Sequence, residues 1–358
     1  MKTEPTPNNS NDVILENIST SSLGINGEFD SLFNALENTS PKKVIDGYKS
    51  MYDAFELYNL EIDNVPKLLD PFFQKVGLAS LVGTSDCGKS TFLRQLSLSI
   101  VLQKETFIGC KLNCKSNKVI YVSTEDDSNS VSAAIRKQIQ YLMVQEANLD
   151  LNKLKKLKFI FDTENLLDIL ALSLEEEPCD LIVIDAFTDV FAKEINANTQ
   201  VRQFLNEYDK LAKKHNCLII FLHHIGKNTQ KNTPNKDSII GSQAFEAKMR
   251  CVIELRPNSH KENCKDLWVL KANFLDSSFK KKSYVLEMTE DLIFKETGER
   301  NSKGQNFKKD NTAIVDKVLD LKNKGLSVRQ IEAELKDTEF KVSKSVVGEI
   351  IKENNKKK

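Results

Sequence analysis

The stretch L-A-S-L-V-G-T-S-D-C-G-K-S-T-F-L, residues 78–93, decides how this chain folds. Its first part, Leu78–Val82, is apolar throughout and predicts a short buried strand. The next segment, Gly83–Ser90, matches the pattern G-x-x-x-x-G-K-[ST] at every constrained position. Ser90–Leu102 then has the pattern of a helix. A phosphate-binding loop requires this order of strand, loop and helix, so the motif indicates a nucleoside triphosphate site.

Each constrained position of this loop has a physical role in holding phosphate. Gly83 and Gly88 allow positive φ angles, so that successive backbone N–H groups can point at one anion. The amino terminus of the following helix adds partial positive charge at the same place. Lys89 can reach the β- and γ-phosphates, and the Ser90 hydroxyl can ligate Mg²⁺. The residues predicted to bind the nucleotide are Gly83, Thr84, Ser85, Asp86, Cys87, Gly88, Lys89, Ser90 and Thr91.

Length and composition are those of a globular protein with one large α/β domain and a smaller additional part. The chain has 358 residues, of which 40% are hydrophobic and 28% are charged. No apolar run approaches the ~20 residues of a membrane span, and the first residues lack the apolar stretch of a secretory signal. The seven cysteines are scattered, and Cys87 lies inside the phosphate loop. This usage predicts reduced thiols in a cytoplasmic protein and disfavours a metal–cysteine site.

Charge is balanced over the whole chain but is distributed unevenly. Residues 1–60 contain four lysines and nine acidic residues, whereas residues 301–358 contain fourteen basic and nine acidic residues. The basic carboxyl-terminal part favours nucleic acid only weakly, because many exposed helices are rich in lysine.

Changes in composition divide the chain into five parts. Residues 1–25 are rich in Asn, Ser and Thr and are predicted to be disordered. Residues 26–64 carry two weak amphipathic patterns, which predict a helical extension that packs either on its own domain or on a neighbouring subunit. Residues 65–297 alternate strands and helices, residues 298–312 have the polar composition of a linker, and residues 313–358 have the spacing of three short helices. The last part is typical of a helix-turn-helix, with a small protein-binding bundle as the alternative.

The alternation in residues 65–297 predicts a mostly parallel sheet flanked by helices, which is an α/β fold. The expected strands are residues 78–82, 119–123, 159–161, 181–184, 217–222, 252–255, 267–272 and 283–288. The expected helices are residues 90–102, 128–145, 166–174, 199–215 and 242–250.

Polar side chains at the ends of three later strands narrow down the chemistry. The strand 119–123 is followed by Glu125, which can orient and deprotonate an attacking water, although an exposed acidic turn is the alternative. L-I-V-I-D ends in Asp185, which would hold Mg²⁺ through water or bind the Ser90 hydroxyl. C-L-I-I-F-L-H-H ends in a histidine pair, of which we favour His224 as a sensor of the γ-phosphate over a plain core or surface role.

Together these motifs resemble the RecA-like P-loop ATPase core and, within it, the plasmid RepA-type hexameric replicative helicases. The resemblance covers residues 66–287. It is based on the phosphate loop and on V-I-Y-V-S-T-E-D-D with Arg136 downstream, L-I-V-I-D-A-F, F-L-H-H-I-G-K, I-I-G-S-Q-A-F-E-A-K-M-R and L-K-A-N-F. It implies ATP hydrolysis with Mg²⁺ at the subunit interfaces of a ring that moves along single-stranded DNA.

The same resemblance implies that the γ-phosphate is also contacted by a neighbouring subunit. Arg250 matches the family's arginine finger, whose guanidinium stabilises transition-state charge, and an ordinary salt bridge is the alternative. Lys271 is a second candidate for an interface cation. The chain departs from the family at Ile240-Gly241-Ser242, where Arg-Gly-Ser is frequent, and at Lys271-Ala272-Asn273, where the broader class has Lys-x-Arg. The second departure leaves Arg250 as the stronger finger candidate.

The basic segment 227–236 predicts a loop that contacts DNA phosphates near the centre of the ring, with a solvated surface loop as the alternative. It contains no aromatic residue, so base stacking is not indicated there.

We therefore predict an ATPase, an ATP-dependent DNA helicase or translocase of RepA type that acts in plasmid, phage or mobile-element replication. It would assemble as a homo-hexamer or another homo-oligomer and bind single-stranded DNA, with duplex DNA and replication or recombination proteins as further candidate partners. Its catalytic residues would be Lys89, Glu125, Asp185, His224 and Arg250, with Ser90 and Asp185 at the metal. The alternatives are an ATP-switched DNA-binding regulator or recombination mediator without unwinding activity, and a defence or signalling ATPase.

Overall fold

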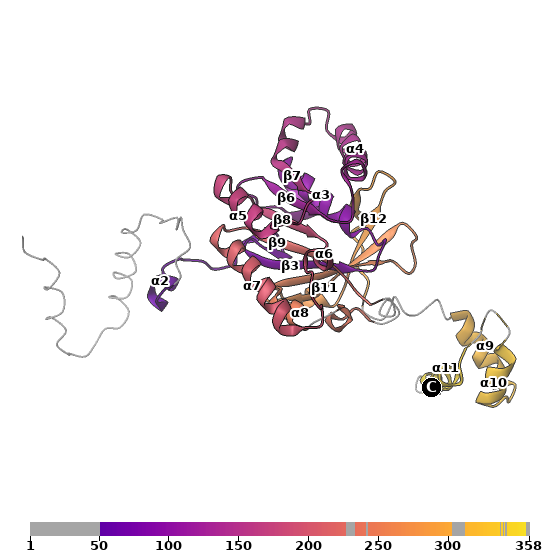
Figure 1. Ribbon diagram of the computed structural model, residues 1–358. Coiled ribbons are helices and arrows are strands. Elements are labelled where there is room, and N and C mark those ends of the chain that lie inside the picture. The colour runs from indigo at the N-terminus through magenta and orange to yellow at the C-terminus, as the bar shows by residue number, and fades with distance from the viewer. Residues whose placement is uncertain are drawn as a thin grey trace, which may run out of the picture. The chain divides into compact units, whose positions relative to one another are not determined.

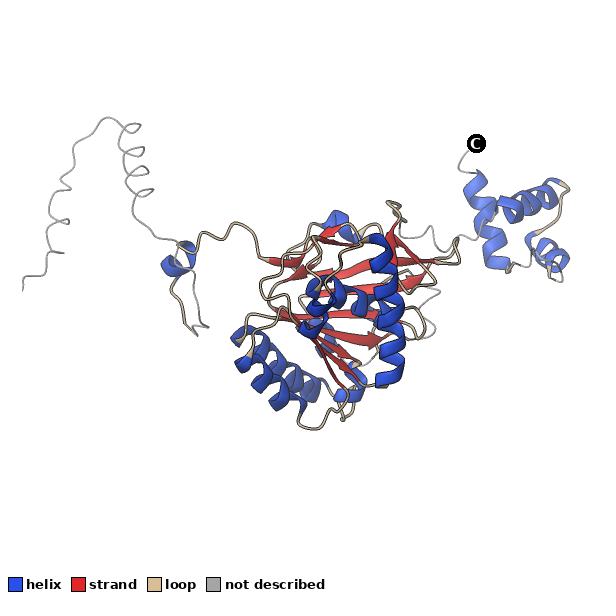
Figure 2. Ribbon diagram, turned by 90° about the horizontal axis from the view of Figure 1, so that it is seen from above, coloured by secondary structure: helices blue, strands red, loops and turns tan. Residues whose placement is uncertain are grey.

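The computed structural model describes residues 51–226, 233–240, 243–302, 312–336, 338, 340 and 342–355. The predicted disordered tail, residues 26–50 of the predicted helical extension, and most of both the basic loop and the linker lie outside the described residues. The large domain is a sheet with helices on both faces (Figure 1 and Figure 2).

The sheet has nine strands in the order β13-β12-β11-β10-β3-β9-β8-β6-β7. Six neighbouring strands are parallel, namely β10 (Cys251–Pro257), β3 (Gly77–Gly83), β9 (Leu218–His224), β8 (Leu181–Asp185), β6 (Val119–Ser123) and β7 (Leu157–Ile160). Three antiparallel strands extend one edge, namely β11 (Cys264–Ala272), β12 (Tyr284–Met288) and β13 (Phe294–Glu296). The prediction of a mostly parallel sheet flanked by helices is confirmed.

Helices cover both faces of this sheet because its strands are apolar on both sides. Leu181 and Val183 of β8 belong to one apolar cluster, whereas Ile182 and Ile184 of the same strand belong to the other. The first cluster includes residues of α3 (Lys89–Val101) and α4 (Ser128–Gln145). The second includes residues of α5 (Leu166–Glu176), α6 (Phe187–Val190), α7 (Asn198–Lys214) and α8 (Gln243–Lys248).

Most expected strands and helices are present, and their ends differ from the expected ones by only a few residues. Several short elements were not expected: β1 (Lys67–Leu69) pairs with β2 (Phe73–Gln74), and β4 (Thr106–Phe107) pairs with β5 (Cys110–Lys111). β13, α6 and short 3-10 helices are further elements of this kind. A strand of two or three residues is too short to show a hydrophobic periodicity, so the sequence pattern does not predict such strand pairs. Before the sheet, the described part of the second amphipathic pattern, from residue 51 on, includes α2 (Ala54–Tyr58), which Asp53 caps.

A buried carboxylate fixes the turn that leads into β6. Asp180 accepts backbone hydrogen bonds from Lys115, Ser116 and Asn117, at 2.8, 2.8 and 2.6 Å. Its own N–H donates to the Lys118 carbonyl at 3.0 Å, so the residue joins the starts of β6 and β8. Hydrogen bonds to an ionised acceptor are stronger than neutral ones, so this turn depends heavily on one side chain.

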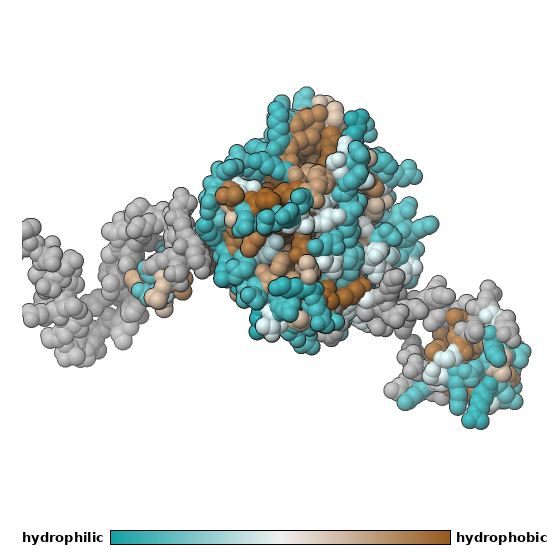
Figure 3. Space-filling view, viewed as in Figure 1, coloured by the Kyte–Doolittle hydropathy of each residue, from teal (hydrophilic) through white to brown (hydrophobic). Residues whose placement is uncertain are grey.

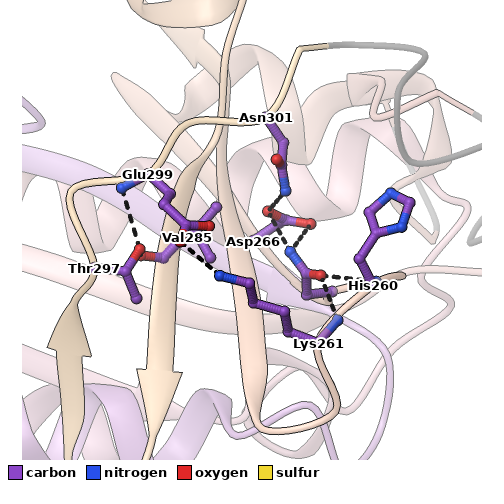
Figure 4. Close-up of polar contacts among 8 residues, drawn as sticks. His260, Lys261, Asp266, Val285, Thr297, Glu299 and Asn301 are labelled. Carbon is purple, nitrogen blue, oxygen red and sulfur yellow. Dashed lines mark hydrogen bonds and ion pairs between the residues drawn. The ribbon is translucent and has the colours of Figure 1, made fainter.

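The segment 298–302, which its composition assigns to the linker, instead hydrogen-bonds to the sheet. Asp266 on β11 accepts hydrogen bonds from the Asn301 side-chain amide at 2.9 Å and from the Ser283 hydroxyl at 2.9 Å. The Asn258 amide lies 3.3 Å from the same carboxylate, and the neighbouring Thr297 hydroxyl donates to the Val285 carbonyl (Figure 4). A fully buried carboxylate needs such partners, and this network holds the segment against β11 and β12.

The carboxyl-terminal module consists of α9 (Thr312–Asn323), α10 (Val328–Leu335) and α11 (Lys344–Asn355). Its core contains Val318, Leu321, Ile331, Leu335 and Val347. Ser327 and Gln330 form a reciprocal capping box at the start of α10. The predicted helix-turn-helix-like module is thus a three-helix bundle with its own core.

In the view of Figure 3, hydrophilic residues cover most of the large domain, and apolar residues show between its helices. None of the described helices combines the length and apolar character that a membrane span requires.

The Asp180 clamp predicts a large stability effect for one substitution. Asp180→Ala leaves three backbone N–H groups without their charged acceptor, so the free energy of unfolding should fall by roughly 2–4 kcal/mol. Urea unfolding monitored by circular dichroism measures the loss. Glu207→Ala, which removes an exposed ion pair with Lys210, is the control and should cost about 0–1 kcal/mol. Equal losses in the two variants would contradict the proposed importance of the clamp.

Candidate functional site

The phosphate loop joins β3 to α3 with the close packing that its glycines allow. Gly88 has φ +96°, a left-handed conformation in which a side chain would be strained. A Cβ atom at Gly83 would lie 2.5 Å from the Leu255 carbonyl oxygen, so this position has no room for a side chain. Lys89 is buried, and its Nζ donates to the Thr84 carbonyl at 2.6 Å. The loop therefore holds its own ammonium group at the place where phosphate is expected.

Asp185 lies at the carboxyl end of β8 and is 3% exposed. Its Oδ2 accepts a hydrogen bond from the Tyr121 hydroxyl at 2.6 Å, whereas its buried Oδ1 has no hydrogen-bond partner among the described residues. Burial raises the pKa of Asp185, and hydrogen bonding to Tyr121 and Ser90 lowers it in part. Burial also raises the pKa of Tyr121 well above its ordinary value, which keeps the phenol protonated as a donor.

This environment suits a magnesium ion bound together with a nucleotide. Asp185 lies near enough to the Ser90 hydroxyl for that group to lower its pKa, and its buried Oδ1 has no partner among the described residues. Mg²⁺ prefers oxygen ligands of this kind. The described residues contain no cluster of three or more His, Cys, Asp or Glu side chains that could hold a metal alone. Phosphate oxygens and water would therefore complete the coordination, as is usual for Mg²⁺ at nucleotide sites.

The acidic turn after β6 contains three carboxylates, and two of them have structural tasks. Asp126 accepts a hydrogen bond at 2.8 Å from Arg94, a buried residue of α3. Asp127 caps α4 through the Ser130 N–H at 2.8 Å, and hydrogen bonds from Ser130 lower its pKa. Glu125 takes part in neither of these contacts, and its Oε1 lies 3.4 Å from the Nε2 of His224.

Backbone pairing explains why Glu125 and His224 meet beside the phosphate loop. His224 ends β9 directly opposite Gly83 of β3. Ser123 of β6 lies opposite Asp185 of β8, which is the strand between β6 and β9. Their side chains stay accessible, since Glu125 is 47% and His224 24% exposed.

Thr124 fixes the start of the acidic turn against β8. Its N–H donates to the Asp185 carbonyl at 2.8 Å, and its hydroxyl accepts from the Ala186 N–H at 3.0 Å. The same hydroxyl also bonds to the Asp189 carboxylate. Sequence reasoning missed Thr124, Tyr121 and Arg94 as members of this site. The one sequence signal for these residues was the acidic cluster T-E-D-D at residues 124–127, which indicates a functional turn but not its partners.

The two histidines at the end of β9 have different environments. His223 is fully buried, and one ring nitrogen lies 2.7 Å from the Ile240 carbonyl oxygen. Its ring packs against Phe187 and Phe245, with centroid distances of 5.1 and 4.5 Å. Burial lowers the pKa of His223 to about 4, so this histidine is a neutral core residue near pH 7. Of the pair, His224 is therefore the one that faces the candidate site.

Arg250 does not join this cluster. It precedes β10, and its N–H donates to the carbonyl of Leu78 near the amino end of β3. The phosphate loop follows the other end of β3, which is roughly 20 Å away for a strand of this length. Nearby ion pairs of the described residues use Lys236, Lys248 and Lys271, and none uses Arg250.

Lys271, the second candidate cation, is engaged within its own chain. Its Nζ donates to the Glu246 carbonyl at 2.8 Å and lies 3.1 Å from the Glu246 carboxylate. The structure thus brings together Lys89, Ser90, Asp185, Glu125 and His224 at one edge of the sheet and leaves Arg250 and Lys271 at the other. Gly241, Ser242 and residues 227–232 lie outside the described residues.

A phosphate loop between strand and helix, with a buried aspartate at the end of a nearby parallel strand, defines a P-loop nucleotide-binding core within an α/β fold. The chain belongs to the AAA domain family, whose family model matches residues 48–230. Comparison with curated protein sequences gives no match. One solved structure of an ATPase domain is similar to 75% of this chain over 99% of its own, with 12% sequence identity and a TM-score of 0.47.

The buried state of His223 predicts a pH dependence of stability. Its pKa falls from 6.5 to about 4 on folding, so between these pH values the unfolded chain binds the extra proton. The contribution of this group is therefore complete above pH 6.5 and decreases by up to ~1.4 kcal/mol per pH unit as the pH falls toward 4. Urea unfolding over a pH series should show a shallower dependence for His223→Gln than for the wild type. The exposed His260→Gln is the control, and an unchanged slope in His223→Gln would contradict the assignment.

Proposed function

We propose that this protein is an ATP-dependent DNA helicase or translocase of RepA type, which acts in plasmid, phage or mobile-element replication. It would work as a homo-oligomer, a hexamer in the first instance, that hydrolyses ATP between subunits. The observation that carries this proposal is the separation of the candidate residues between two edges of the sheet. Five of them gather around the phosphate loop, whereas Arg250 lies at the opposite edge, where only a second copy could bring it to the nucleotide. DNA as the substrate is supported by the motifs shared with the RepA-type family.

Nucleotide binding would use the groups already positioned around the loop. The Lys89 ammonium would leave the Thr84 carbonyl and bind the β- and γ-phosphates, because a phosphate anion is a stronger partner than a neutral carbonyl. Ser90 and Asp185 would hold Mg²⁺, which supplies positive charge to the phosphate oxygens when bound. Tyr121 would keep Asp185 in place through its hydroxyl.

Hydrolysis requires a base near the γ-phosphate, and Glu125 is our candidate. Its carboxylate would take a proton from water as the water oxygen bonds to the γ-phosphorus and the bond to the bridging oxygen of ADP breaks. His224 would orient Glu125 through the 3.4 Å contact and sense whether the γ-phosphate is present. Arg250 of a neighbouring copy would stabilise the charge that develops on the γ-phosphate.

Replacing the base should separate binding from turnover. Glu125→Gln keeps the size and polarity of the side chain but removes its basicity, so kcat should fall about 10²–10⁴-fold while ATP still binds. Steady-state ATPase assays and titration with a fluorescent ATP analogue measure the two quantities. Glu164→Gln, an exposed substitution after β7, is the matched control. Full turnover in Glu125→Gln would remove this residue as the base.

A mixing experiment tests the composite site. Lys89→Ala and Arg250→Ala should each abolish hydrolysis, since one lacks the phosphate ligand and the other the finger. In an equimolar mixture, roughly a quarter of the interfaces would pair an intact Lys89 with an intact Arg250, so partial activity should return. Lys248→Ala removes a neighbouring cation that pairs with Asp209, and it should leave turnover near the wild-type level. A mixture that stays inactive, or an active Arg250→Ala, would contradict catalysis between subunits.

A second candidate function is an ATP-switched DNA-binding regulator or recombination mediator. The observation that favours it is the three-helix module with its own core and capping box, because sequence-specific DNA contacts are not needed for processive unwinding. A forked-duplex assay distinguishes the two functions. ATP hydrolysis without strand separation would favour the regulator.

A further inference from the structure

A lysine-rich segment lies far from the candidate ATPase site and has no part in the mechanism proposed above. Residues 153–158 read K-L-K-K-L-K, with four lysines in six positions. They belong to a 3-10 helix, η1 (Leu151–Lys156), and to the start of β7. Leu154 and Leu157 pack against the apolar core, so their contacts hold the lysines between them at the surface. Short segments of this composition are a known signature of patches that bind nucleic acid.

Three of these lysines, together with Lys118, line one pocket. The pocket has a volume of about 300 Å³, and Ser173 and Glu177 from the end of α5 complete its polar lining. We call it the lysine pocket. Glu177 is its single carboxylate and lies 3.1 Å from the Nζ of Lys118 and 3.8 Å from the Nζ of Lys158. The pocket thus carries an excess of positive charge.

Lys155 and Lys156 contribute the charge that Glu177 does not neutralise. Neither forms an ion pair with any residue that the structure describes. Like charges held this close repel one another, and an anion bound among them would relieve the repulsion. The lining includes neither arginine nor an aromatic residue, so it offers point charges for phosphate but no surface for base stacking.

The pocket lies at the amino-terminal edge of the parallel strands. Val119 begins β6 and Leu157 begins β7, and the phosphate loop follows the carboxyl end of β3 at the opposite edge. β6 and β7 lie next to each other at one end of the sheet (Figure 1). Substitutions in the pocket can therefore be made without touching Lys89, Asp185 or Glu125.

We propose that the lysine pocket binds the phosphodiester backbone of single-stranded DNA, as a second contact outside the basic loop 227–236. This inference rests on the proposed function, because that function makes DNA the polyanion that the protein meets. Lysines in an open pocket neutralise phosphates without reading the sequence. Glu177 limits the affinity by pairing with two of the four lysines, so the pocket holds the strand weakly enough for it to move.

The role of Glu177 makes the proposal testable in two directions. Lys155→Ala/Lys156→Ala removes two phosphate contacts, so affinity for a fluorescein-labelled oligo-dT should fall about 10- to 30-fold at roughly 0.1 M salt. The slope of log affinity against log salt should become shallower by about 1.4. Glu177→Gln frees Lys118 and Lys158, so affinity should rise and the slope should steepen. Fluorescence anisotropy over a salt series measures both quantities on the full chain.

Two surface lysines of α7 provide a control with the same change in net charge. Lys210→Ala/Lys214→Ala removes lysines that pair with Glu207 and Glu175, and it should change DNA affinity by less than either pocket variant. ATP hydrolysis measured without DNA should match the wild type in all three variants, which shows that they fold.

The outcomes separate the pocket from the proposed function. If the wild type binds oligo-dT and the pocket variants bind it equally well, the pocket assignment is overturned and the helicase proposal stands. If the wild type binds no DNA, the proposed function fails, and the pocket assignment fails with it. If a glutamate-rich peptide displaces oligo-dT from the wild type more effectively than unlabelled oligo-dT does, the pocket belongs to an acidic protein segment and the proposal is overturned.

Discussion

Parallel pairing of six strands is the constraint on which the rest of this structure depends. Parallel neighbours place all their carboxyl ends at one edge of the sheet, so side chains far apart in the sequence meet there. The phosphate loop, Glu125, Asp185 and His224 all follow or end such strands. The same constraint places Arg250, which precedes a strand, at the opposite edge. A single sheet thus separates the groups proposed to bind a nucleotide from the cation proposed to complete its hydrolysis.

Within the carboxyl edge, the structure assigns different tasks to similar groups through their surroundings. Three acidic residues follow β6, but Arg94 binds Asp126 and the start of α4 uses Asp127 as its cap. Glu125 has neither of these tasks, and its carboxylate lies near His224. Two histidines end β9, and burial between aromatic rings makes His223 a core residue while His224 stays accessible. Strand geometry selects between the two histidines, because successive side chains of β9 point in opposite directions. Among the three acidic residues, a salt bridge and a helix cap occupy the other two carboxylates.

Much of this arrangement could be predicted from the sequence, because the motifs lie at the ends of long apolar runs. A run such as L-I-V-I-D predicts a buried strand, and it also predicts that the last residue lies at the carboxyl edge of the sheet. The partners that tune each group could not be predicted in this way. Tyr121 hydrogen-bonds Asp185 from a neighbouring strand, and Arg94 reaches Asp126 from a helix. Such contacts depend on the register between elements, which no local pattern contains. The packing of residues 298–302 could not be predicted for the same reason. Their polar composition is typical of a linker, and the hydrogen-bond partner of Asn301, Asp266, is far away in the sequence.

The separation of the two edges has a consequence for assembly. If Arg250 of one copy approaches the phosphate loop of the next, the contact joins two different surfaces, the amino edge of one sheet and the carboxyl edge of another. In a head-to-tail contact of this kind, a pair of copies still has one free surface of each type. Further copies can therefore add until a ring closes or a filament forms. Nucleotide between the two edges would supply the negative charge that Lys89 and Arg250 both require. ATP binding and subunit contact would then stabilise each other, and in a ring the loss of the γ-phosphate on hydrolysis would weaken one of the interfaces.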